Sequence, residues 1–122
     1  MPTFSEMDPH TTYRAQLGAD TGPIVLANTL TSTPEDIDEV IAIWKADAEF
    51  MKAQPGFVST QLHRGTAGSG TLLNVAVWET TAHLRNAFMS DEFQQHISRY
   101  PDSAVVSPHV FERLAVEGIC VA

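Results

Sequence analysis

Residues 72–84, LLNVAVWETTAHL, read as a β-strand that runs directly into an α-helix. Leucine, valine and tryptophan favour strands, and the threonines that follow Glu79 are typical helix caps. Asn74 stands among these apolar residues, and a buried amide costs free energy unless it is hydrogen-bonded. Asn74 therefore either completes a hydrogen bond of the fold or faces a ligand.

The residues before this stretch predict a β-hairpin. FVSTQLHRG (57–65) reads as a strand, and the Gly/Ser-rich GTAGSG (65–70) joins it to the strand that contains Asn74. GTAGSG does not open a helix and has no downstream acid of the kind that a dinucleotide loop needs. We therefore interpret it as a hairpin turn.

A long amphipathic helix precedes the hairpin, in STPEDIDEVIAIWKADAEFMKAQPG (32–56). A Ser/Thr cap and Pro34 at the first helical position predict its start, and QPG predicts its end. Its apolar stripe, which we assign to the core with Trp44 included, comprises Ile37, Val40, Ile41, Trp44, Ala48 and Met51.

The remaining elements complete a β-α-β-β-α-β order. PIVLANTLT (23–31) is the first strand, and the second helix starts at Thr80 or Thr81, restarts near Ser90 and ends by Pro101. The last strand is predicted from about Ala104 to Val116, with Pro108 at an edge or bulge. This order predicts an α+β, ferredoxin-like split βαβ fold, with both helices on one face of an antiparallel sheet.

Residues 1–22 are polar and aperiodic, so we expect an N-terminal extension, which could lie as an arm over a neighbour, before one domain at 23–122. The first and third strands are apolar on both faces, whereas two helices cover only one face. We therefore expect a homodimer through the open sheet face. The alternative is that the N-terminal arm covers this face.

Composition excludes several functions. The formal net charge of -8 makes nucleic acid a poor partner, and no apolar run approaches the length of a membrane span. The single cysteine, Cys120, and the lack of a signal-peptide pattern at the start favour a cytoplasmic protein. No His, Asp or Glu set has the spacing of a metal site on one helix face, so we expect no metal.

Two segments, QPGFVSTQLHRG and LLNVAVWETTAHLRNAFMSDEF, resemble the antibiotic biosynthesis monooxygenase superfamily, the dimeric α+β barrel proteins. The resemblance covers roughly residues 23–116. Its marks are PGF at the start of the second strand and Trp-Glu-Thr at the end of the third. The resemblance implies the fold more strongly than it implies any particular function.

LLNVAVWET also resembles the corresponding strand of small cofactor-independent monooxygenases, which oxidise phenolic or anthrone-type polyketide intermediates to quinones with dioxygen. The resemblance implies catalytic roles for Asn74 and Trp78 and no cofactor. A tyrosine of those enzymes falls at Leu84 here, and their helix arginine is matched loosely by Arg99. The implied substrate is an aromatic small molecule.

Strand periodicity places Asn74 and Trp78 on one face, and Asn28 and Leu26 of the first strand could face the same space. An amide and an indole N–H can each donate a hydrogen bond to a substrate oxyanion. Further candidates for substrate contact or proton transfer are Leu84, Phe88, His63, His96 and Arg99. The simpler interpretation is that Asn74 satisfies the sheet and Trp78 anchors the core.

Two other functions stay open. LANTLT resembles the first strand of haem-degrading relatives, which implies a haem pocket with Asn28 in it and His96 near the position of the proximal histidine. Their pocket tryptophan falls at Ala87 or Phe88 here. The third possibility is a non-catalytic protein that binds a small ligand or a pathway partner, because one fold hosts many functions.

Overall fold

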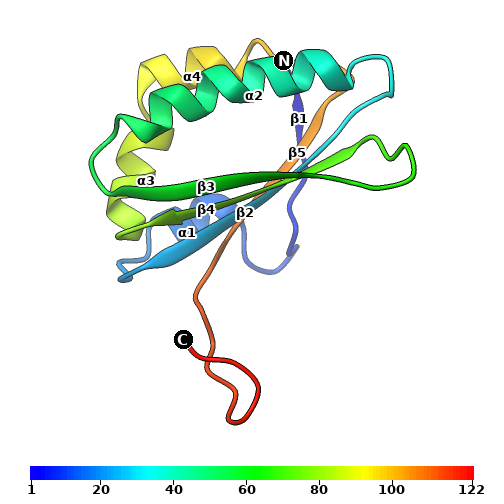
Figure 1. Ribbon diagram of the computed structural model, residues 1–122. Coiled ribbons are helices and arrows are strands. Elements are labelled where there is room, and N and C mark those ends of the chain that lie inside the picture. The colour runs from blue at the N-terminus through cyan, green and yellow to red at the C-terminus, as the bar shows by residue number, and fades with distance from the viewer.

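The computed structural model describes all 122 residues and places the helices against one side of a five-stranded sheet (Figure 1). The sheet order is β1-β5-β2-β4-β3, antiparallel except for β1, which runs parallel to β5. The α+β, ferredoxin-like prediction is confirmed. The elements are β1 Thr3–Phe4, α1 Tyr13–Leu17, β2 Ile24–Thr31, α2 Ile37–Lys52, β3 Phe57–Arg64, β4 Thr71–Trp78, α3 Thr81–Phe88, α4 Asp91–Ile97 and β5 Val105–Phe111.

Side-chain caps define the helices that follow β4. The Thr80 hydroxyl accepts a hydrogen bond from the His83 N–H at the start of α3, and Ser90 accepts one from the Phe93 N–H at the start of α4. The predicted interruption at Ser90 is confirmed. The start of α2 differs from the prediction, since residues 33–36 form a turn and the helix begins at Ile37 instead of Pro34.

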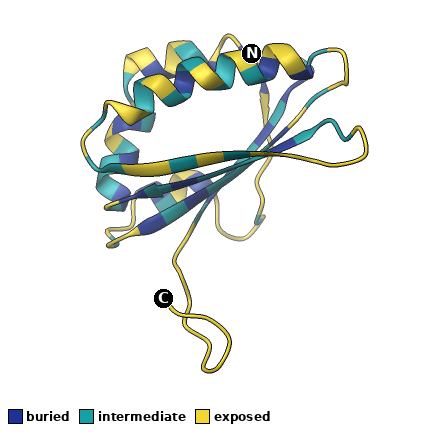
Figure 2. Ribbon diagram, in the orientation of Figure 1, coloured by how far each residue is buried: buried dark blue, intermediate teal, exposed yellow.

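Strand β5 is shorter than predicted, because it ends at Phe111 instead of Val116. Phe111 pairs with Val25, close to the start of β2, so the following residues have no strand beside them in this chain. The C-terminal segment 112–122 instead leaves the body of the protein, and all of it is exposed (Figures 1 and 2).

The N-terminal segment belongs to the hydrophobic core of the same chain, which differs from the predicted polar extension. β1 pairs with the edge of β5, and α1 buries Tyr13 and Leu17 in a cluster that also holds Leu84. The Tyr13 ring meets Phe88 edge-on at a centroid distance of 5.0 Å. A helix as short as α1 has too few residues for its apolar spacing to be detected in the sequence.

The two faces of the sheet differ in burial. On the helix side, Ile24, Leu30, Leu72 and Trp78 are buried in two core clusters. The opposite face carries the half-buried apolar side chains Val25, Ala27, Leu73, Val75 and Val77. The N-terminal segment packs at the β5 edge and against α3, so the alternative in which it covers the open face is wrong.

None of the helices has the length and apolar character that a membrane span requires.

Candidate functional site

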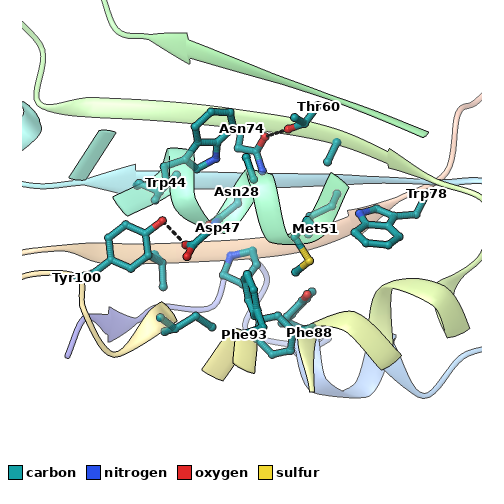
Figure 3. A pocket seen from close by; sticks show the side chains of 18 of the residues that line it. Asn28, Trp44, Asp47, Met51, Thr60, Asn74, Trp78, Phe88, Phe93 and Tyr100 are labelled. Carbon is teal, nitrogen blue, oxygen red and sulfur yellow. Dashed lines mark hydrogen bonds between the residues drawn. The ribbon is translucent and has the colours of Figure 1, made fainter. Parts of the chain in front are cut away.

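A cavity lies between the sheet and the helices, and most of its wall is apolar (Figure 3). The cavity proper is ≈ 80 Å³, and the space grows to ≈ 710 Å³ when its mouth, open to solvent, is included. Strands β2, β3, β4 and β5 form its floor, and α2, α3 and α4 form its roof and one end. Its wall comprises Phe4, Tyr13, Leu26, Asn28, Leu30, Trp44, Asp47, Ala48, Met51, Phe57, Thr60, Asn74, Ala76, Trp78, Phe88, Phe93, Ile97, Tyr100, Val106 and Pro108.

Asn74 enters this cavity from β4. The Thr60 hydroxyl of β3 donates a hydrogen bond to Asn74 Oδ1 at 2.6 Å, which uses the carbonyl end of the amide. The amide nitrogen has no acceptor in the chain, and in Figure 3 it points into the cavity. The structure therefore combines the two sequence interpretations, because the oxygen serves the fold and the two N–H donors face the cavity.

Asn28 of β2 lies directly across the ladder from Asn74, and both line the cavity. The Ser107 N–H of β5 donates to Asn28 Oδ1 at 3.0 Å, so this amide too has its oxygen engaged by the protein. Neither amide nitrogen has a partner in the chain. Two neighbouring amides can thus offer N–H groups to the same negatively charged or carbonyl oxygen.

Trp78 both anchors the core and forms part of the cavity wall. It is almost fully buried, and its ring meets Phe57 edge-on with a centroid distance of 5.5 Å. Its indole N–H makes no hydrogen bond within the chain. Leu26 and Phe88 also line the cavity, whereas Leu84 is buried in the core cluster and does not reach the wall.

The other predicted contacts are not in the cavity wall. His63 is exposed on the opposite face of the sheet, because its neighbour Leu62 packs toward the helices and successive side chains alternate. Arg99 is exposed outside the wall. His96 lies behind the wall against Phe50, so no histidine lines the cavity, and the axial ligand that the haem alternative needs is not supplied there.

The sequence interpretation missed Asp47, the one charged side chain in the cavity wall. Asp47 occupies the same helical stripe as Val40, Trp44 and Met51, and this spacing was the signal that could have revealed it. Trp44, assigned only to the core, is also part of the wall. Burial raises the pKa of the Asp47 carboxyl to about 6, against lowering effects from the Tyr100 hydrogen bond and from His96 and Arg99.

Tyr13 contributes a second polar group that sequence reasoning did not assign to the site. Its hydroxyl is buried, has no hydrogen-bond partner, and belongs to a ring that lines the cavity. Burial raises the pKa of this phenol, so it stays protonated and can only donate or accept a hydrogen bond. Tyr13 comes from the N-terminal segment, which therefore helps to form the cavity.

Comparisons with known proteins bear on the family and on the fold. The sequence profile described as "Antibiotic biosynthesis monooxygenase" matches residues 23–99. The chain belongs to the antibiotic biosynthesis monooxygenase family. An uncharacterized protein of the cyanobacterium Synechocystis is 28% identical over 85 residues, which make up 70% of this chain and 57% of that relative. The matched part of this chain therefore spans little more than half the length of that relative.

Solved structures share the family fold. SnoaB, a cofactor-independent oxygenase from Streptomyces nogalater, superposes with a TM-score of 0.69 at 21% identity, covering 80% of this chain and 99% of that one. A protein of Shewanella loihica, described as a candidate monooxygenase, has a TM-score of 0.67 at 26% identity. The match covers 81% of this chain and 100% of that one. The family and its fold are thereby established for this chain.

Proposed function

We propose that this family member is a cofactor-independent monooxygenase that oxidises a phenolic or anthrone-type aromatic substrate to a quinone with dioxygen. The observation that carries the proposal is the pair of asparagine amides, Asn28 and Asn74, with unpartnered N–H donors in an otherwise apolar cavity. An apolar space with a few convergent polar groups suits a flat aromatic ligand that carries an oxygen.

The chemistry that such a cavity must support is modest. An electron-rich aromatic anion can pass an electron to dioxygen itself, so the protein has to bind the substrate, stabilise the anion and exclude water. The amide donors of Asn28 and Asn74 would bind the anionic oxygen without being proton sources. Trp78, Phe88 and Leu26 would form the apolar walls on which the rings pack.

The direct test is dioxygen consumption with 1,8-dihydroxyanthrone as the probe, using protein that has been treated with chelator and freed of flavin. We expect quinone formation at a rate above the uncatalysed one. Strict dependence on added flavin, iron or haem would contradict the cofactor-independent assignment. Binding of the probe without dioxygen consumption would favour the non-catalytic ligand-binding alternative.

Asn74→Ala tests the amide pair. Loss of a donor that acts mainly in the transition state costs roughly a hundredfold in rate. Asn86→Ala is the matched control, because Asn86 is an exposed asparagine on α3 outside the cavity wall. Near-normal turnover of Asn74→Ala in the folded fraction, with a lowered melting temperature, would show that this residue is only structural.

We also propose that the protein acts as a homodimer through the open sheet face. Two features support a second copy as the occupant: the half-buried apolar side chains on that face, and the apolar residues Leu114 and Ile119, 75% and 82% exposed, in the C-terminal segment that continues from β5. Light scattering at micromolar concentration should give twice the chain mass of 13.3 kDa. A monomer under those conditions would refute the assignment.

A further inference from the structure

Asp47 forms a cluster with Tyr100 and His96 at the helix side of the cavity. It enters the cavity wall from α2, which lies over the sheet that carries Asn28 and Asn74, and its exposed fraction is 6% (Figure 3). The Tyr100 hydroxyl donates a hydrogen bond to Asp47 Oδ2 at 2.7 Å. Asp47 Oδ1 has no hydrogen-bond donor, although a buried carboxylate oxygen normally has one.

His96 of α4 completes the cluster. Its Nδ1 lies 3.4 Å from Asp47 Oδ1, close enough for an ion pair but not aligned for a hydrogen bond, and this nitrogen has no other partner. Three titratable or charged groups thus act on Asp47, namely Tyr100, His96 and Arg99. On the strand side of the cavity, the polar wall residues are Asn28, Thr60 and Asn74, and none of these side chains titrates.

We propose that Asp47 is the general base of this site, which takes the proton from the aromatic substrate held at Asn28 and Asn74, and that Tyr100 and His96 are positioning residues for its carboxylate. The oxidation that this proton transfer would start rests on the proposed function. The coupling between the charge of a bound ligand and the proton on Asp47 is independent of that function. It requires only that the two groups share one cavity.

Charge balance favours the transfer. Two negative charges in one small apolar cavity repel each other strongly, whereas a single charge can be accommodated. When the proton moves from the substrate to Asp47, the negative charge moves from the carboxylate on α2 to the oxygen held by the amides on the sheet. The cavity carries one negative charge before and after the step, so no new charge is created away from water.

The raised pKa of Asp47 also suits the role. A phenol titrates near 10, so a carboxyl with a pKa of about 6 lies about 4 units away, compared with about 6 units for an ordinary carboxyl. The difference of about two units favours the proton transfer about a hundredfold. A base with this pKa is still ionised at neutral pH and is therefore ready to accept the proton.

The complete reaction balances when an anthrone methylene is taken as the substrate. Asp47 takes one C–H proton, the carbon anion bonds to dioxygen, and Asp47 returns the proton to the peroxide anion. Asp47 then takes the second C–H proton while the O–O bond breaks and the C=O bond forms. That proton joins the leaving hydroxide as water, so the methylene loses four electrons and dioxygen gains four.

The first test compares Asp47→Asn with Glu49→Gln, an exposed carboxylate on the same helix as the control. With 1,8-dihydroxyanthrone, we expect kcat of the wild type to decline below about pH 6. The kcat of Asp47→Asn should be about a hundredfold or more lower and should lack this decline. Glu49→Gln should behave as the wild type. A kcat of Asp47→Asn within a few-fold of the wild type, with the same pH profile, would overturn the proposal.

The second test needs no oxidation. Calorimetry of 4-nitrophenol binding at pH 8, in two buffers of different ionisation enthalpy, counts the protons taken up. The wild type and Glu49→Gln should take up close to one proton per bound 4-nitrophenolate, and Asp47→Asn should take up none. Binding to the wild type without proton uptake would overturn the role of Asp47 even if the oxidation is confirmed.

The two tests fail in different ways. Proton uptake without any dioxygen consumption would leave Asp47 as the proton acceptor of the site and refute the oxygenase function. Failure of the wild type to bind either aromatic probe would refute the cavity as a site for phenolic ligands, and the proposal for Asp47 with it.

Discussion

Asp47→Asn should make the protein more stable at neutral pH, because the wild type keeps an ionised carboxylate in a buried site. Burial raises the folded-state pKa of Asp47 from 3.8 to about 6, and each pKa unit corresponds to 1.36 kcal/mol. The ionised group therefore costs about 3 kcal/mol of unfolding free energy above pH 6. The asparagine removes this cost, and its Oδ1 can still accept the hydrogen bond from the Tyr100 hydroxyl.

The sign follows from the protons bound in each state. Between pH 3.8 and about 6 the folded protein holds a proton on Asp47 that the unfolded chain has lost, so the stability of the wild type falls as the pH rises through this window. The advantage of Asp47→Asn should be absent below pH 3.8, grow through the window and be constant above it.

Thermal unfolding measured by circular dichroism from pH 3.5 to pH 8, at one fixed protein concentration, checks this. For a domain of this size we expect the melting temperature of Asp47→Asn to exceed that of the wild type by on the order of 10 °C at pH 8. Glu49→Gln should change little, because Glu49 is exposed. A variant that is less stable than the wild type at pH 8 would refute the view that Asp47 is kept at the expense of stability.

Trp78→Phe should retain most of the apolar wall but lose the indole N–H, so turnover should fall more than the melting temperature; equal losses would assign Trp78 to the core alone. Tyr100→Phe removes a hydrogen bond that lowers the pKa of Asp47, so the acid limb of the pH–rate profile should move above pH 6; an unmoved limb would dissociate Tyr100 from the base. Leu17→Ala should cost about 3 kcal/mol in denaturant unfolding, whereas Met89→Ala, at an exposed side chain, should cost little; equal effects would remove α1 from the core.

Local patterns in the sequence were sufficient for most of the fold. The helical stripe of α2, the hairpin at residues 57–78 and the restart at Ser90 were all readable, because each depends on residues close together in the chain. The N-terminal segment and the end of β5 were not readable. Their structures depend on distant partners: Tyr13 packs on Phe88, and β5 ends where β2 no longer runs beside it.

The candidate site, like the fold, was predictable from the sequence only where it depends on local periodicity. Strand alternation in the sequence was enough to place Asn74 and Trp78 on one face, and the structure sets Asn28 directly opposite Asn74. The same alternation carries His63 to the far face, because the neighbouring Leu62 packs toward the helices. Sequence alone could not show that the oxygen of each amide already accepts a hydrogen bond within the fold, since the donors, Thr60 and Ser107, come from other strands.

The sequence by itself determined the order of elements from β2 to β5, the apolar stripes and the shared face of Asn74 and Trp78, because these follow from the periodicity of helices and strands. Only the tertiary structure decided that Asp47 is the charged group of the cavity. Its neighbours Tyr100 and His96 lie about fifty residues further along the chain, and its pKa depends on the burial that their packing creates. A carboxylate on a helix has no distinguishing mark in the sequence. The burial and the partners that folding brings to Asp47 set the pKa of its carboxyl.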